Sequence, residues 1–218
     1  MNLKKVKCVI VDFDATLYSN GDWSKEPEFF GTYLAERNLL PEISSWEKKL
    51  EFLREKHPNF HIIKSIFAYL HESGIDDSDF RKFNNEHICE IRGKDTVFIK
   101  PEIIEEISNH YPIYIVSDSS VPYLEFYLDY AGINKNFFSG IYENEYNDET
   151  YSKISIMKRV LGESGVKSNE IIMIGDSEYS DIQPAKLLGF QTKHIKHVSE
   201  TEEILQELIN MKSSKTIK

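Results

Sequence analysis

The feature that most constrains the fold is a short apolar run ending in two aspartates, Val9-Ile10-Val11-Asp12-Phe13-Asp14-Ala15-Thr16. A short, continuous, β-branched run is typical of a strand buried on both faces of a parallel sheet. Asp12 and Asp14 then stand at its carboxyl end, where open α/β sheets bind their ligands. Two carboxylates this close repel each other unless a cation neutralises them or one holds a proton. The segment is therefore either a solvated acidic turn or a catalytic, metal-binding pair.

Four further apolar segments have the character of buried strands, and helical patterns separate them. The strands are expected at residues 113–116, 137–142, 171–174 and 191–195, and the helices at 101–109, 121–131, 153–165 and 180–188. Strands that alternate with helices through short connections predict a Rossmann-like α/β fold with a doubly wound parallel sheet.

The interval from residue 19 to residue 92 breaks this alternation, because it contains no strong strand. Four helical segments are expected there, at residues 26–37, 45–56, 62–72 and 77–89. The interval is too long for a simple connection inside a compact α/β sheet. We therefore predict a helical domain over 19–92, inserted into an α/β core formed by residues 1–18 and 93–218.

Composition limits the classes of partner. The chain carries 36 acidic and 26 basic residues, for a net charge of -10, which argues against a nucleic-acid-binding surface and against binding to an anionic membrane. No apolar stretch approaches membrane-spanning length. Cys8 and Cys89 have neither metal-ligand spacing nor a disulfide framework, so the reducing cytoplasm is the expected location. The sequence gives no indication of oligomeric state.

Three more groups of polar residues follow along the chain, two at the ends of predicted strands and one at the start of a predicted helix. Ser117 and Asp118 end the second strand, and hydroxyl and backbone N–H groups at such a junction suit an anion. Lys153 opens a helix and can reach a phosphate as a point charge, with Lys158 on the same helix as a competitor. Each group alone has an ordinary explanation as a helix cap or a surface charge.

The last group follows the fourth predicted strand. Gly175-Asp176 ends that strand, and Asp181 lies in the same loop. One loop can thus aim two carboxylates at one cation, and Mg²⁺ prefers such oxygen ligands while keeping several waters.

In this order the groups resemble the motifs of the haloacid dehalogenase superfamily of phosphatases, over roughly residues 1–18 and 93–198. The matching residues are Asp12, Asp14 and Thr16 for the first motif, Ser117 for the second, Lys153 for the third, and Asp176 and Asp181 for the fourth. The helical insertion resembles the mobile cap of the family. Two departures stand out: Ala15 replaces a common glycine, and Ile154 follows Lys153 where many members have proline.

The resemblance implies a mechanism. Asp12 would attack phosphorus and form an aspartyl-phosphate, while Asp14 would protonate the leaving oxygen and then deprotonate the attacking water. The substrate would be a small phosphorylated metabolite. The metal would be Mg²⁺, held by Asp12, the backbone carbonyl of Asp14, Asp176 and Asp181. The phosphoryl group would be held by Thr16, Ser117, the backbone N–H of Asp118, and Lys153.

Three alternatives remain at this point. A phosphomutase uses the same core but would yield a sugar phosphate isomer in place of free phosphate. A catalytically silent binding protein could retain the fold, although the complete acidic set argues against it. A response-regulator receiver domain also has an acidic cluster, but its phosphorylated aspartate does not normally end the first strand. Within the superfamily, Asp14 favours phosphoryl transfer over carbon–halogen cleavage, which needs no proton donor to an alkoxide.

Overall fold

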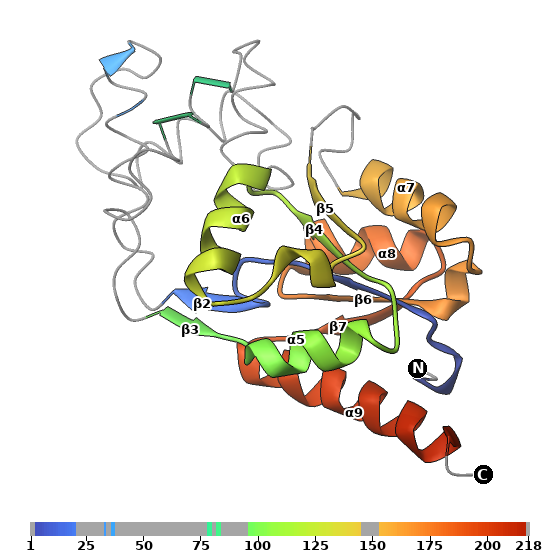
Figure 1. Ribbon diagram of the computed structural model, residues 1–218. Helices are drawn as coiled ribbons and strands as arrows, with labels where there is room; N and C mark the ends of the chain where they lie inside the picture. The colour runs from blue at the N-terminus through green and yellow to red at the C-terminus, as the bar shows by residue number, and fades with distance from the viewer. Residues whose placement is uncertain are drawn as a thin grey trace. The chain divides into compact units, whose positions relative to one another are not determined.

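The computed structural model describes residues 3–20, 33, 36–37, 78–79, 82–83, 96–144 and 153–216. Five parallel strands form one sheet in the order β5-β4-β1-β6-β7 (Figure 1). The strands are β1 (Cys8–Val11), β4 (Ile113–Ser117), β5 (Gly140–Glu143), β6 (Ile171–Gly175) and β7 (Gln191–His194). This is the Rossmann-like, doubly wound sheet that the alternating pattern predicts.

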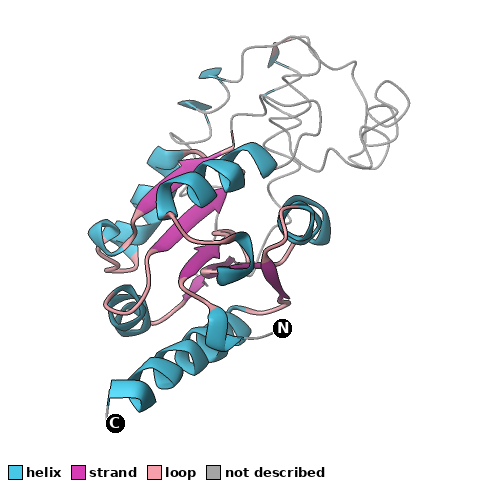
Figure 2. Cartoon of the chain, turned by 90° about the vertical axis from the view of Figure 1, so that its right-hand side faces the viewer, coloured by secondary structure: helices cyan, strands magenta, loops and turns pink. Residues whose placement is uncertain are grey.

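Helices cover both faces of the sheet (Figure 2). They are α5 (Pro101–Ser108), α6 (Val121–Tyr130), α7 (Ile154–Ser164), α8 (Gln183–Leu187) and α9 (Val198–Thr216). None of the helices in the part of the chain described is long and apolar enough to cross a membrane.

The central strands are buried on both faces, which explains their continuous apolar runs. Cys8 and Ile10 of β1 face one side, where they pack in one cluster with Met157 of α7 and Ala185 of α8. Because side chains alternate along a strand, the remaining β1 residues face the opposite side. The helices α5 and α9 contact each other and lie on that side in Figure 1.

Three elements differ from the sequence-based expectation. The strand expected at 137–142 begins only at Gly140, because Lys135–Phe137 forms a 3₁₀ turn capped by the side chain of Asn134. The helix expected at 180–188 is divided into a wide π-type turn, η5 (Glu178–Ile182), followed by α8. Helix α9 was not anticipated, although the buried Leu205 and Leu208 that fix it to the core recur at helical spacing.

The chain divides into two compact units, one formed by Met1–Ser19 with Val97–Lys218 and the other by Asn20–Thr96. Two short strands, β2 (Tyr18–Asn20) and β3 (Thr96–Phe98), pair with each other where the chain passes between the units. Within the second unit, residues 33, 36, 78–79 and 82–83 are helical. The rest of the four helices predicted for this interval lies outside the described residues.

The two ends of the second unit contact each other. Tyr33 packs its ring on Phe83 and donates a hydrogen bond to Asp79 over 3.1 Å. Arg37 donates to the same carboxylate over 2.8 Å. These contacts join residues near the start of the unit to residues near its end.

Candidate active site

The polar residues singled out in the sequence come together at one edge of the sheet. Asp12 directly follows β1, Ser117 ends β4, and Asp176 directly follows β6. Strand β1 lies between β4 and β6, all three are parallel, and their carboxyl ends therefore meet. The chain also reverses direction across the sheet at β1, which is the switch point where doubly wound folds place ligand sites.

A buried lysine lies among these carboxylates. The Lys153 ammonium is 2.6 Å from Asp12 Oδ1, 2.7 Å from Asp181 Oδ1 and 4.0 Å from Asp118 Oδ2. Burial opposes the charge on Lys153, but the surrounding carboxylates outweigh it and hold the pKa of Lys153 well above its usual range. Lys158, the alternative lysine on α7, is exposed. The geometry therefore brings Lys153 to Asp12.

Three carboxylates are close enough to share a cation. One oxygen each from Asp12, Asp176 and Asp181 lies within 4.8 Å of the others. Burial raises the pKa of Asp12, and the nearby Asp181 and Asp14 add to this effect while Lys153 opposes it. Burial, followed by the charge of Asp12, raises the pKa of Asp176 to about 6. Burial also raises the pKa of Asp181.

These carboxylates have the donor chemistry that Mg²⁺ needs. Three negative charges face the single ammonium of Lys153, so the cluster keeps an excess of negative charge. Burial is the main cause of the raised pKa values of Asp12, Asp176 and Asp181, and repulsion from a neighbouring carboxylate adds to each of them. Hard oxygen ligands with uncompensated charge suit a small divalent cation that retains several waters. The residues present therefore fit a magnesium ion.

The loop after β6 aims Asp181 back at the strand. In η5 the backbone N–H groups of Asp181 and Ile182 both bond to the Ser177 carbonyl, and the Ser177 N–H bonds to Asp181 Oδ2 over 3.0 Å. Such wide turns are frequent at functional sites. A Cβ at Gly175 would lie only 2.4 Å from Asp181 Oδ2. Glycine at this position is therefore what allows the buried carboxylate of Asp181 to pack against the end of β6.

Asp14 has different surroundings from Asp12. Ser119 donates a hydrogen bond to Asp14 Oδ2 over 2.6 Å, and Tyr123 donates to Asp14 Oδ1 over 2.8 Å. The tight turn that follows Asp14 places Ala15 at φ 57°, in the left-handed region. This φ explains why glycine is favourable there, and alanine bears a cost of about 1–2 kcal/mol. Thr16 closes the turn and donates to Asp12 Oδ2 over 3.3 Å.

The loop after β4 is held by its own polar groups. The Ser117 hydroxyl accepts a hydrogen bond from the Ser119 N–H over 3.0 Å. The buried Asn144 donates from its backbone to the Ser117 carbonyl over 2.7 Å and from its side chain to Asp118 Oδ1 over 2.9 Å. Asp118 is thus fixed beside Lys153 by a residue that follows β5.

Sequence reasoning missed the contacts that Ser119, Tyr123 and Asn144 make. Tyr123 lies on α6, 109 residues from its partner Asp14. No short motif contains the pair, because the contact arises only when β4 and α6 pack beside the turn after β1. The proximity of Ser119 to Ser117 was the only available signal, and it indicated an anion site in general terms.

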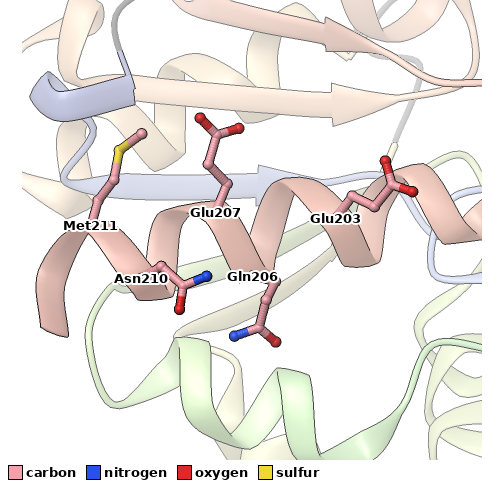
Figure 3. Close-up of a pocket in the computed structure, with 5 residues that line it drawn as sticks. All are labelled: Glu203, Gln206, Glu207, Asn210 and Met211. Atoms are coloured by element: carbon pink, nitrogen blue, oxygen red, sulfur yellow. The ribbon is translucent and has the colours of Figure 1, made fainter. Parts of the chain in front are cut away.

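A separate pocket lies along α9 (Figure 3) and is lined by Glu203, Gln206, Glu207, Asn210 and Met211. All five residues belong to one helix. None of these lining residues is basic, whereas the cluster at the sheet edge contains Lys153.

Several solved structures share the fold. A predicted phosphoglycolate phosphatase from Haemophilus somnus is 15% identical, with a TM-score of 0.57, and 90% of this chain and 91% of that chain are covered. A haloacid dehalogenase (HAD) family enzyme from Bacteroides thetaiotaomicron, in complex with magnesium and inorganic phosphate, is 17% identical, with a TM-score of 0.53 and coverage of 87% and 93%. A 2-haloacid dehalogenase from Pseudomonas syringae is also 17% identical, with a TM-score of 0.52 and coverage of 93% and 99%. At these identities the likeness shows the fold alone.

No curated protein matches the sequence. The sequence model of the haloacid dehalogenase-like hydrolases matches residues 6–189, which is most of the chain. The motifs, the sheet order and this match agree, and the protein therefore belongs to the haloacid dehalogenase-like hydrolase family.

Proposed function

We propose that the protein is a Mg²⁺-dependent phosphomonoester hydrolase that works through an aspartyl-phosphate on Asp12. The observation that carries the proposal is the contrast between two aspartates two residues apart. Asp12 is buried and bonded to an ammonium group, whereas the Asp14 carboxylate is bonded to two hydroxyl groups. The first arrangement suits a charged nucleophile, and the second suits a group that gains and loses a proton.

In the first half-reaction an Asp12 oxygen attacks phosphorus, and the bond from phosphorus to the leaving oxygen breaks. Asp14 gives its proton to that oxygen, so an alcohol leaves. In the second half-reaction water attacks phosphorus, Asp14 takes a proton from the water, and the bond to Asp12 breaks. The products are inorganic phosphate and the regenerated carboxylate of Asp12.

Phosphoryl transfer depends mainly on positioning and on neutralising charge. Asp12, Asp176 and Asp181 would hold Mg²⁺ with the backbone carbonyl of Asp14, and the bound cation would offset the charge of the phosphoryl oxygens. Lys153, Ser117, Thr16 and the backbone N–H of Asp118 would hold the same oxygens. The magnesium and inorganic phosphate in the related Bacteroides enzyme support this part of the proposal.

Phosphate release from a panel of phosphorylated metabolites, with and without Mg²⁺, tests the activity. We expect a chelator to abolish release, Mg²⁺ to restore it, and Ca²⁺ to support it poorly because Ca²⁺ does not enforce octahedral geometry. Asp176→Asn should weaken the apparent Mg²⁺ affinity more than Asp181→Asn, because Lys153 and the Ser177 N–H already occupy both Asp181 oxygens. A rearranged sugar phosphate in place of free phosphate would indicate a phosphomutase, and turnover without any metal would contradict the proposal.

We further propose that residues 19–92 act as a cap that contributes to substrate selection. The length of the interval and the pairing of β2 with β3 where the chain leaves and re-enters the core support this role. Replacing the interval by a short Gly/Ser linker should leave slow hydrolysis of an activated aryl phosphate and remove most activity on the preferred metabolite. A linker variant with unchanged substrate preference would place specificity in the core loops instead.

A further inference from the structure

A chain of hydroxyl groups leads from the interior of the core to Asp14. Tyr18 and Tyr123 are both almost fully buried, with exposed fractions of 0% and 1%. Their hydroxyl oxygens are hydrogen-bonded to each other, and the Tyr123 hydroxyl also contacts Asp14 Oδ1 over 2.8 Å. Ser119 contacts the other oxygen of Asp14 over 2.6 Å.

The direction of these bonds follows from counting protons. A phenol hydroxyl has one proton to donate and can accept in return. When Asp14 is ionised, the Tyr123 hydroxyl donates its hydrogen bond to Asp14 and therefore accepts a hydrogen bond from the Tyr18 hydroxyl. When Asp14 is protonated, the same hydroxyl groups can rotate and accept. A lysine or a backbone N–H in their place could donate a hydrogen bond but could not accept one from the protonated carboxyl group.

Ring packing fixes the two hydroxyl groups in space. The Tyr18 ring stacks on Tyr127 of α6 with centroids 4.9 Å apart, and on Phe98 of β3 with centroids 5.4 Å apart. Phe13 lies between the aspartates in sequence and packs against both Tyr18 and Tyr123, with centroids 5.2 and 6.2 Å away. The two hydroxyl groups are therefore carried by packed aromatic rings from β2, β3 and α6.

We infer that Tyr123, supported by Tyr18, is a positioning residue that holds Asp14 in one orientation in both of its protonation states. This inference rests on the proposed phosphatase function and adds two residues to it. An acid that must first donate a proton and later remove one needs partners that tolerate both states. Tyr123 and Ser119 meet this requirement from opposite oxygens of the carboxyl group.

The test uses phenyl phosphate and p-nitrophenyl phosphate as matched substrates of the full chain with Mg²⁺. The ratio kcat/KM reports the steps up to departure of the phenol, and p-nitrophenol is the more acidic leaving group and needs less help from Asp14. General acid–base catalysis typically contributes 10²–10⁴-fold. We expect Tyr123→Phe to lower kcat/KM for phenyl phosphate about tenfold more than for p-nitrophenyl phosphate, which would be a partial loss of that contribution.

Companion variants keep the test decisive if Tyr123→Phe folds poorly. Ser119→Ala removes the donor on the other oxygen of Asp14 and should give the same selective loss. Tyr18→Phe should give a smaller loss of the same kind. The matched control is Tyr130→Phe, which removes an exposed hydroxyl from the same helix and should leave both substrates unaffected.

The outcomes separate the inference from the function on which it rests. Equal losses on the two esters, or no loss on either, in the folded Tyr123→Phe and Ser119→Ala variants would overturn the positioning role while leaving the phosphatase intact. Failure of the wild-type protein to hydrolyse either ester, or any phosphorylated metabolite, would instead overturn the proposed function.

Discussion

The surroundings of Asp12 and Asp14 differ in kind, although the two residues are separated only by Phe13. On the Asp12 side, Lys153 joins two buried carboxylates through short ion pairs. On the Asp14 side, the neutral hydroxyl groups of Ser119 and Tyr123 donate hydrogen bonds to the carboxylate. Ionic partners favour one protonation state, whereas hydroxyl partners accept either. The same residue type can thus perform two different tasks because distant parts of the chain supply different partners.

The largest expected effect is on Asp12, the proposed nucleophile. Asp12→Asn should lower phosphatase activity at least ~10³-fold, equivalent to roughly 4 kcal/mol of barrier, because an amide neither attacks phosphorus nor carries charge to the metal. Release of phosphate from p-nitrophenyl phosphate measures the loss, and a thermal melt checks that the variant is folded. Activity within tenfold of the wild type would remove Asp12 from this role.

The ionic partners on the Asp12 side should matter for stability. Lys153→Met leaves two buried carboxylates without their cation and should lower the free energy of unfolding by about 3–5 kcal/mol. The matched control is Lys158→Met on the exposed face of the same helix, which should change it by less than about 0.5 kcal/mol. Urea denaturation without metal measures both variants. Equal effects at the two positions would contradict the view that Lys153 neutralises the cluster.

Stability without metal should depend on pH, and the sign follows from the carboxyl groups on the Asp12 side. The pKa of Asp176 is raised from 3.8 to about 6, and the pKa values of Asp12 and Asp181 are also raised. Between pH 3.8 and about pH 6 the folded protein therefore binds more protons than the unfolded chain. The free energy of unfolding consequently falls as pH rises through this range. Thermal midpoints measured from pH 4 to pH 7 should decrease, and Mg²⁺ should flatten the decrease. A rising midpoint in metal-free buffer would show that other groups dominate.

The smallest effect concerns the turn directly after Asp14. Ala15 has φ 57°, so Ala15→Gly relieves about 1–2 kcal/mol of strain but increases the entropy of the unfolded chain by about 0.4–1 kcal/mol. The net gain in stability should lie between about 0 and about 1.6 kcal/mol, with activity unchanged. Ala131→Gly is the control, because Ala131 has φ -77° and should only lose stability. A destabilised Ala15→Gly variant would mean that the methyl group of Ala15 contributes packing that exceeds the strain.

The sequence predicted the parts of this arrangement that depend on local pattern. The apolar runs of β1, β4 and β6 identify buried parallel strands, and a strand end fixes where Asp12, Ser117 and Asp176 must lie. The predicted start of β5 was wrong because Phe137 and Phe138 have the apolar character of strand residues. In the structure, Lys135–Phe137 forms a 3₁₀ turn that the Asn134 side chain caps. Apolar character alone does not distinguish a strand from a short helical turn.

The partners of Asp14 depend on packing between distant segments, and no local pattern encodes them. Tyr123 looks like any core residue of α6, and only the approach of α6 to the turn after β1 gives its hydroxyl a polar partner. Most of the four helices expected at 19–92 lies outside the described part of the chain.

Gly175 packs so closely against Asp181 that it should not tolerate mutation, although it takes no part in the chemistry. Any side chain at residue 175 would begin with a Cβ 2.4 Å from a buried carboxylate oxygen, and that oxygen is held in place by the Ser177 N–H. Every substitution must therefore displace Asp181 or the end of β6. A saturation survey of the chain would score Gly175 as severely as the aspartates themselves, although the glycine contributes only the absence of atoms. Substitution fails at this position because Asp181 already occupies the space that a side chain at residue 175 would need. Variants redesigned on this loop must therefore keep glycine at residue 175.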